Sequence, residues 1–117
     1  MIIRYGEHKI DVVPGPFEGG CGSVSFKRII ETPEELCGKG RVFSVVTLEK
    51  DCGLGFHTHN GDVEYYLMLS GEAEYSDNGE QTVLRAGDTS FCGDGEGHAI
   101  VNRRDEPVVL VALIIYT

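Results

Sequence analysis

Hydrophobic positions along the chain recur in short runs separated by glycine-rich turns. Turn residues interrupt these runs about every eight to twelve residues, a spacing typical of sandwiches and barrels. The runs are rich in Val, Ile, Thr and Tyr, which favour strands over helices. The pattern therefore predicts an all-β protein, with strands at 2–5, 8–13, 23–30, 41–49, 55–59, 63–70, 72–76, 80–85, 88–92, 98–102 and 107–116.

Two local signals refine this picture. In "ETPEELCGKG", Thr32 is a suitable N-cap, Pro33 suits the first helical position and Glu35 the capping-box position. One short helical turn is therefore expected there. In "SDNGEQ", the pair Asn78-Gly79 is a strong hairpin signal, because a tight type I′ turn requires positive φ at both central residues.

Length and charge limit the class of protein. A chain of 117 residues suits one domain, 1–117, with one core. The formal net charge of -9 repels phosphate backbones, so a nucleic-acid partner is not expected. The first ten residues lack the apolar segment of a signal peptide. We therefore expect a cytoplasmic protein.

The C-terminal run "PVVLVALIIY" is strongly apolar but much shorter than the roughly 20 residues that cross a bilayer. It predicts a strand buried on both faces rather than a membrane segment. Such an apolar strand, together with the long N-terminal segment, also suggests surfaces covered by a partner. The sequence therefore predicts a homodimer.

The four cysteines are spread along the chain without any CxxC pair, at Cys21, Cys37, Cys52 and Cys92. This spacing argues against a zinc ribbon or a thioredoxin-type motif. In a cytoplasmic chain we expect free thiols.

Candidate chemistry is concentrated in "GFHTHNGDVEYYLMLSG", residues 55–71. Side chains alternate faces along a strand, so His57 and His59 project from the same face, roughly 6.5–7 Å apart. The turn signal "NGD" follows, and Glu64 lies near the start of the next strand. Two nitrogen ligands and one oxygen ligand can thus come from one hairpin, and a bound cation would offset the cost of a carboxylate facing an apolar interior.

A second cluster, "GDTSFCGDGEGHAIVN", brings a glycine-rich turn directly before His98. If this strand lies beside the hairpin in a closed barrel, His98 supplies a fourth ligand. Three histidines and one glutamate leave two open positions on an octahedral ion, where a substrate or water binds. This ligand set suits Mn, Fe, Ni, Co or Zn.

Other residues of the site follow from strand parity. Tyr66 shares a face with Glu64, and its phenol is a candidate hydrogen-bond donor or general acid, although a buried tyrosine hydroxyl also needs a partner for structural reasons. Arg41 either clamps a substrate carboxylate or lies on the barrel rim in water, and we favour the rim.

The two clusters closely resemble the two sequence motifs of the cupin superfamily. The residues at motif positions are His57, His59, Glu64 and Gly71 in the first, and Gly87, Gly95, His98 and Asn102 in the second. The chain departs from the motifs at Asp51, where the first motif begins with Gly, and at Gly93, which replaces a Pro. Neither departure removes a ligand.

The resemblance implies a small double-stranded β-helix (jelly-roll) barrel, often dimerised through its N-terminal strand and outer sheet. Most of the chain looks like the single-domain proteins labelled oxalate-decarboxylase-like, which commonly hold manganese, so Mn or Fe is preferred here. The two-domain oxalate decarboxylases carry an Arg just before the first His, and "DCGLGF" has none. Oxalate decarboxylation is therefore not expected.

Two classes of function remain open. One is a metal-dependent enzyme acting on a small carboxylate or sugar-acid-like substrate, with the ion as Lewis acid. The other is a non-enzymatic module in which the same site binds a small ligand, or the metal ion stabilises the barrel. An acid or base within reach of the open positions distinguishes them, and Tyr66 is the candidate.

Overall fold

The computed structural model describes all 117 residues and consists of ten strands with two short 3₁₀ turns. The predicted all-β class is confirmed. The strands are β1 (Ile10–Pro14), β2 (Ser23–Arg28), β3 (Gly40–Leu48), β4 (Cys52–Thr58), β5 (Asp62–Ser70), β6 (Glu72–Asp77), β7 (Glu80–Arg85), β8 (Thr89–Cys92), β9 (Gly97–Asn102) and β10 (Val108–Tyr116). The 3₁₀ turns are η1 (Tyr5–Glu7) and η2 (Pro33–Leu36).

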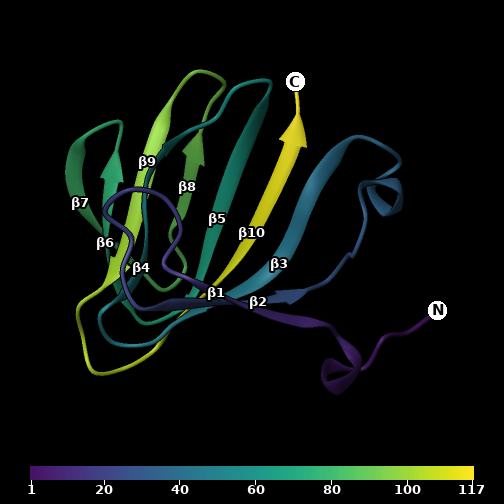
Figure 1. Ribbon diagram of the computed structural model, residues 1–117, viewed down its shortest axis with the longest axis horizontal. Helices are drawn as coiled ribbons and strands as arrows, with labels where there is room; N and C mark the ends of the chain where they lie inside the picture. Colours follow the sequence, from purple (N-terminus) through teal and green to yellow (C-terminus); the bar gives the residue numbers. More distant parts are fainter.

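The strands form two antiparallel sheets that face each other (Figure 1). The larger sheet has the order β1-β2-β3-β10-β5-β8, and the smaller has the order β4-β9-β6-β7. From β3 onward the chain passes from one sheet to the other at every connection except the β6–β7 hairpin, which lies within the smaller sheet. This is the arrangement of a jelly-roll barrel, as the sequence predicted.

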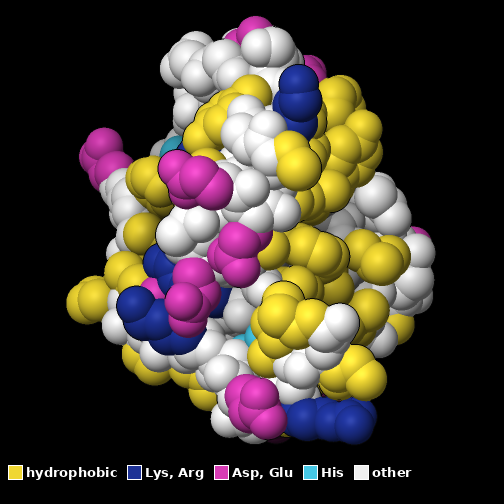
Figure 2. Space-filling model, turned by 90° about the vertical axis from the view of Figure 1, so that its right-hand side faces the viewer, with side chains coloured by type: hydrophobic (Ala, Val, Ile, Leu, Met, Phe, Trp, Pro, Cys, Tyr) yellow, Lys and Arg dark blue, Asp and Glu magenta, His cyan; other side chains and the backbone are white.

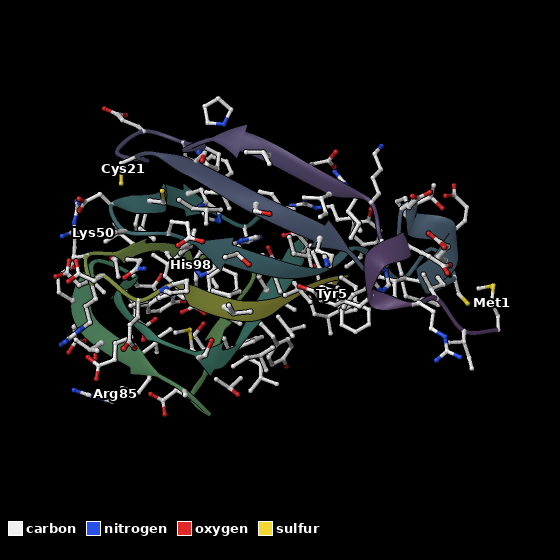
Figure 3. All side chains as sticks on the ribbon, turned by 90° about the horizontal axis from the view of Figure 1, so that it is seen from below. Met1, Tyr5, Cys21, Lys50, Arg85 and His98 are labelled. Carbon is white, nitrogen blue, oxygen red and sulfur yellow. The ribbon has the colours of Figure 1, made fainter.

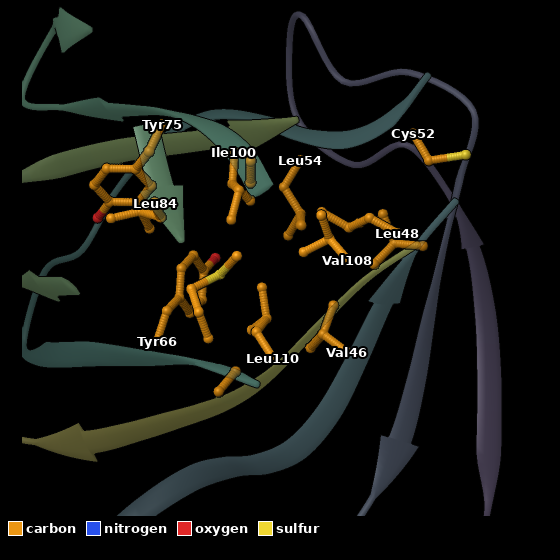
Figure 4. Packing of buried hydrophobic residues seen from close by; sticks show 14 residues of the cluster. Val46, Leu48, Cys52, Leu54, Tyr66, Tyr75, Leu84, Ile100, Val108 and Leu110 are labelled. Carbon is orange, nitrogen blue, oxygen red and sulfur yellow. The ribbon is translucent and has the colours of Figure 1, made fainter. Parts of the chain in front are cut away.

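The core fills the space between the sheets (Figure 4). Inward positions alternate with outward ones along β5, where Glu64, Tyr66 and Met68 are buried while Tyr65 and Leu67 are exposed. Tyr66 points from the larger sheet toward side chains of the smaller one (Figure 4). The fourteen residues of the cluster come from both sheets, so the core holds the two layers together.

Both local signals are confirmed. Thr32 and Glu35 form the reciprocal capping box at the start of η2. The β6–β7 hairpin turns at Asn78 and Gly79, whose φ values of 53° and 92° are both positive. The residue types in these two turns are therefore sufficient to specify them, without help from tertiary contacts.

Two predictions about strands are wrong. Residues 2–5 pair with no strand, because this exposed segment extends past the sheet and ends in η1. Met1 lies at the opposite end of the molecule from His98 (Figure 3). β10 is buried on its inner face only, and its outward residues such as Val111 and Leu113 are half-buried. No helix has the length and apolar character needed to span a membrane.

Candidate metal centre

The four predicted ligands converge between the two sheets. His57 lies near the end of β4, His59 just after it, Glu64 in β5 and His98 in β9. One ligand atom from each lies within 4.8 Å of all the others. Three ligands thus come from the smaller sheet and its margin and one from the larger, and His98 lies near the middle of the molecule (Figure 3).

The ligand atoms have the separations that a single ion requires. Nε2 of His98 lies 2.9 Å from Oε1 of Glu64, 3.1 Å from Nε2 of His57 and 3.2 Å from Nε2 of His59. Two ligands held about 2.1 Å from an ion at right angles lie about 3.0 Å apart. His57 and Glu64 are farther apart, at 3.8 Å. The group therefore fits neighbouring corners of one coordination shell.

The outer nitrogen of each histidine is also occupied. Nδ1 of His57 donates to the carbonyl oxygen of Gly55 at 2.9 Å, and Nδ1 of His59 donates to the Asp62 carboxylate at 2.8 Å. Because these partners only accept, both imidazoles present an Nε2 lone pair to the centre. Nδ1 of His98 is paired at 2.7 Å with the Tyr75 hydroxyl, which can accept its N–H.

The electrostatics of the centre also call for a cation. Burial alone would raise the pKa of Glu64, but hydrogen bonds from His57, His59 and His98 outweigh it and hold this pKa far below its usual value. In the metal-free protein the hydrogen bond to Glu64 raises the pKa of His59. Burial lowers the pKa of His98. A divalent metal ion would take the place of the imidazole protons that face Glu64 in the metal-free protein, and would neutralise the ionised carboxylate.

A bulge in β4 brings His57 to the inner face. Leu54 pairs with Ile100 and His57 pairs with His98, so β4 has one more residue than β9 between these pairs. In a regular strand Leu54 and His57, three residues apart, would point to opposite faces, and the extra residue lets both point inward. Gly55 lies in this bulge, and a Cβ there would overlap the carbonyl oxygen of Glu18. Glycine is thus required for the β1–β2 loop to pack beside the site.

A pocket of about 270 Å³ opens beside the cluster and is lined by His57, His59 and Glu64. A larger surface hollow, of about 540 Å³, is lined by polar residues from Lys50 to Glu106 and contains none of the four ligands. The smaller pocket is therefore the candidate binding site, because it alone combines the ligand group with apolar walls.

Arg41 lines this pocket, although the sequence favoured a position on the rim. Because Arg41 is next to the inward-facing Val42, strict alternation along β3 would point its side chain outward. However, Val42 pairs with Ile114 and Gly40 pairs with Ile115, so Arg41 has no partner and forms a bulge. This bulge turns the side chain toward Asp62, whose carboxylate accepts from Nε at 2.9 Å. The guanidinium remains 45% exposed, so the site and the rim meet at this residue.

Asp62 links Arg41 to the ligand His59. It is 6% exposed. Burial raises its pKa, but hydrogen bonds from Arg41 and His59 outweigh burial and lower the pKa below its usual value. The carboxylate is therefore ionised and orients His59 from behind. Sequence reasoning treated Asp62 only as a turn residue.

Phe17 was also missed by the sequence analysis. It lies in the β1–β2 loop, and its ring stacks on His57 with centroids 4.1 Å apart and planes 18° apart. Its φ of 68° is uncommon for a residue other than glycine. Nothing in the local pattern distinguishes it from any other loop aromatic.

Tyr66 lies behind the ligands rather than in the pocket wall. It is 3% exposed, and its ring stacks on His98 with centroids 4.9 Å apart. Burial, reinforced by the charge of Glu64, raises its pKa well above the usual value. The phenol thus keeps its proton and remains a hydrogen-bond donor.

The four cysteines are free. Cys92 pairs with Glu64 across β8 and β5, and burial raises the pKa of its thiol to about 11. Cys52 is buried in the hydrophobic cluster. Neither belongs to the group of clustered side chains that could hold a metal ion.

Comparison with known proteins identifies the family. Residues 44–116 match the Cupin_2 family, a cupin domain. Because this segment covers more than half of the chain and contains all four clustered ligands, the protein belongs to the cupin family, as the motifs indicated.

Relatives match over nearly the whole chain. The oxalate-binding protein of Thermotoga maritima is 31% identical over 115 residues, which cover 98% of this chain and 93% of the relative. The crystal structure of a predicted oxalate decarboxylase from Thermotoga maritima superimposes with a TM-score of 0.92 at 31% identity, covering 100% of both chains. An uncharacterised double-stranded β-helix protein from Klebsiella pneumoniae gives a TM-score of 0.70 at 25% identity, covering 98% of this chain and 89% of the other.

Proposed function

We propose that this cupin holds a divalent metal ion through His57, His59, Glu64 and His98 and uses it to bind a small carboxylate. The observation that carries the proposal is that the inner nitrogens of the histidines converge on a buried carboxylate while the outer nitrogens are all hydrogen-bonded. The relative named as an oxalate-binding protein supports the ligand class. Manganese or iron is the proposed metal, with nickel, cobalt and zinc as alternatives.

Elemental analysis of protein purified without chelators tests the metal site. We expect close to one Mn or Fe per chain in the wild type and none in His98→Ala. No metal in either protein, with no uptake of Mn, Fe, Ni, Co or Zn, would contradict the proposal. Circular dichroism of the variant must show an intact barrel, because His98 is fully buried.

Arg41 is proposed to recognise the ligand's carboxylate. Its Nε is held by Asp62, which leaves the other guanidinium N–H groups without protein partners at the mouth of the pocket. A guanidinium matches the two oxygens of a carboxylate. It also compensates locally for the net charge of -9, which repels anions. In calorimetry, Arg41→Gln is expected to weaken oxalate binding more than tenfold while metal content stays unchanged.

An enzymatic reaction at this site is proposed to involve proton donation by Tyr66, while a bound divalent ion would act as Lewis acid on the carboxylate. Binding without turnover is the second candidate, and one observation favours it. Tyr66 does not line the pocket, and its ring stacks on His98 behind the cluster. A screen of small carboxylic acids for turnover by Tyr66→Phe and wild type distinguishes the two: a binder shows no turnover and equal affinity in both proteins.

We further propose a homodimer. The outward side chains Tyr65, Leu67 and Leu69 of β5 and Phe91 of β8 are 42–50% exposed and form an apolar surface beside β10. Hydrophobic side chains also form broad areas on the side that carries the N-terminal segment (Figure 2). A second copy would cover such surfaces. A monomer in light scattering at micromolar concentration would contradict this. The four free thiols support a cytoplasmic location.

A further inference from the structure

We propose that the pocket selects carboxylates that carry a short apolar side chain, such as branched α-keto acids, over oxalate itself. This inference rests on the proposed function, because it names the ligand class of the same site. It is carried by the uneven distribution of polar and apolar groups around the pocket beside the histidine cluster.

The polar groups lie together on one side. His57, His59 and Glu64 provide the metal side of the pocket, and Arg41 lies across Asp62 from His59. A ligand that binds the ion through an oxo-acid group and offers a carboxylate oxygen to Arg41 satisfies all of these groups. The remaining wall offers such a ligand no further charged or hydrogen-bonding side chain.

The remaining wall is apolar and is assembled from six different parts of the chain. Strands β1, β2, β3, β4 and β10 and the β1–β2 loop each contribute a hydrophobic side chain, namely Val13, Phe26, Val42, Leu54, Ile114 and Phe17. Oxalate has no apolar atom to place against this wall, and a carboxylate turned toward it would lose hydration without gaining a partner. An alkyl group there would instead be removed from water.

Phe17 is the part of this wall built at the greatest conformational cost. Its backbone adopts φ of 68°, which persists only where surrounding contacts enforce it. The loop is fixed to β4 by the hydrogen bond from Gly55 N–H to the Pro16 carbonyl, at 2.9 Å. The ring is 54% exposed and covers the outer face of His57. A hydrophobic ligand side chain would cover part of this exposed ring.

The volume limits the size of the side chain. The pocket measures about 270 Å³, at the small end of the roughly 300–1,000 Å³ of ligand sites. Leu54 and Ile114 belong to the barrel interior and are 8% and 5% exposed, so the wall cannot retreat. A branched chain of a few carbons is therefore favoured over a large aromatic group.

Isothermal titration calorimetry of the manganese-loaded protein tests the inference. The probes are oxalate, glyoxylate, pyruvate, α-ketobutyrate and α-ketoisocaproate, which vary the group beside one oxo-acid head. We expect affinity to rise from glyoxylate to α-ketoisocaproate by about fourfold for each buried methylene, and the last to exceed oxalate. If oxalate binds but the series is flat or falls with chain length, the selectivity is wrong and the carboxylate-binding function stands. If no acid binds, both are wrong.

A substitution in the wall gives a second test. Val42→Thr keeps the shape of the side chain and places a hydroxyl in the apolar wall. It should weaken α-ketoisocaproate about fivefold and leave glyoxylate within twofold, since only the longer ligand meets that wall. Val45→Thr is the matched control on the opposite face of β3, outside the pocket, and should change neither affinity. Equal weakening of both acids by Val42→Thr, or none of either, would overturn the proposal.

Discussion

The inner face of β5 passes through two different environments within one strand. At its start, Asp62 and Glu64 are buried among histidines and an arginine, and both oxygens of Asp62 and Oε1 of Glu64 face nitrogens. At its end, Met68 is 1% exposed within the apolar cluster. Both halves are equally buried, yet the first depends on exact partners and the second on volume alone. Burial therefore does not reveal which half carries function.

The largest effect on metal binding and on metal-linked stability should come from an isosteric substitution at the polar end of β5. Glu64→Gln keeps the shape but removes the negative charge, and we expect the metal content to fall from about one per chain to almost none. At a free manganese concentration of 100 times Kd, the wild type should gain about 2.7 kcal/mol in free energy of unfolding, and the variant none. Thermal unfolding with and without manganese measures this, and equal stabilisation of both proteins would show that Glu64 is not a ligand.

A cavity at the apolar end should lower stability and leave metal binding unchanged. Leu110 is fully buried in the cluster, so Leu110→Ala should lower the free energy of unfolding by about 2–5 kcal/mol. Urea denaturation of the metal-free protein measures the loss. Metal stoichiometry should stay at the wild-type value because no ligand touches this position. A loss of metal in the folded variant would mean that the halves are not independent.

Tyr75, on β6 of the facing sheet, contacts both environments and tests the boundary between them. Tyr75 belongs to the hydrophobic cluster, and its hydroxyl pairs with Nδ1 of His98. We expect Tyr75→Phe to weaken metal affinity about 10–100-fold, as for other groups that orient a ligand histidine. Competition with a chelator of known affinity gives the value. Tyr65→Phe, at an exposed position on β5, is the matched control, and the same affinity in both variants would remove the orienting role.

The smallest effect on stability is expected at the apolar end of β5, for a substitution that changes the side-chain volume as little as Glu64→Gln does. Met68→Leu conserves volume and polarity, so the free energy of unfolding should change by less than about 1.5 kcal/mol. Metal content should be unchanged. A larger loss in chemical denaturation would show that this half also depends on exact shape.

The strands and the ligands were predictable because they follow from local alternation. His57 and His59 are two positions apart, and side chains two positions apart on a strand share a face. Glu64 follows a turn that glycine permits, so the next strand brings it back to the same site. The segment 2–5 has the same composition but no neighbouring strand to pair with, which residue pattern cannot show. Strand pairing is a property of the whole sheet.

The pocket was less predictable because it depends on bulges and long-range contacts. The bulge at Arg41 turns this side chain to the face opposite the one that strand alternation predicts. The bulge in β4 likewise changes which face the residues from His57 onward occupy. Tyr75 meets His98 from a strand more than twenty residues earlier in the chain. Phe17 is placed by a loop whose conformation depends on glycines packed against β4. Each of these requires the register between strands, which a single sequence does not contain.

The distribution of the ligands over both sheets has a mechanical consequence. Of the four proposed ligands, Glu64 alone lies on the larger sheet, while His57 and His98 belong to the smaller. An ion held by all four would act as a cross-link between the layers, comparable with a disulfide in restricting how they separate. Amide hydrogens of β4 and β9 should then exchange with solvent more slowly when manganese is bound than in the metal-free protein.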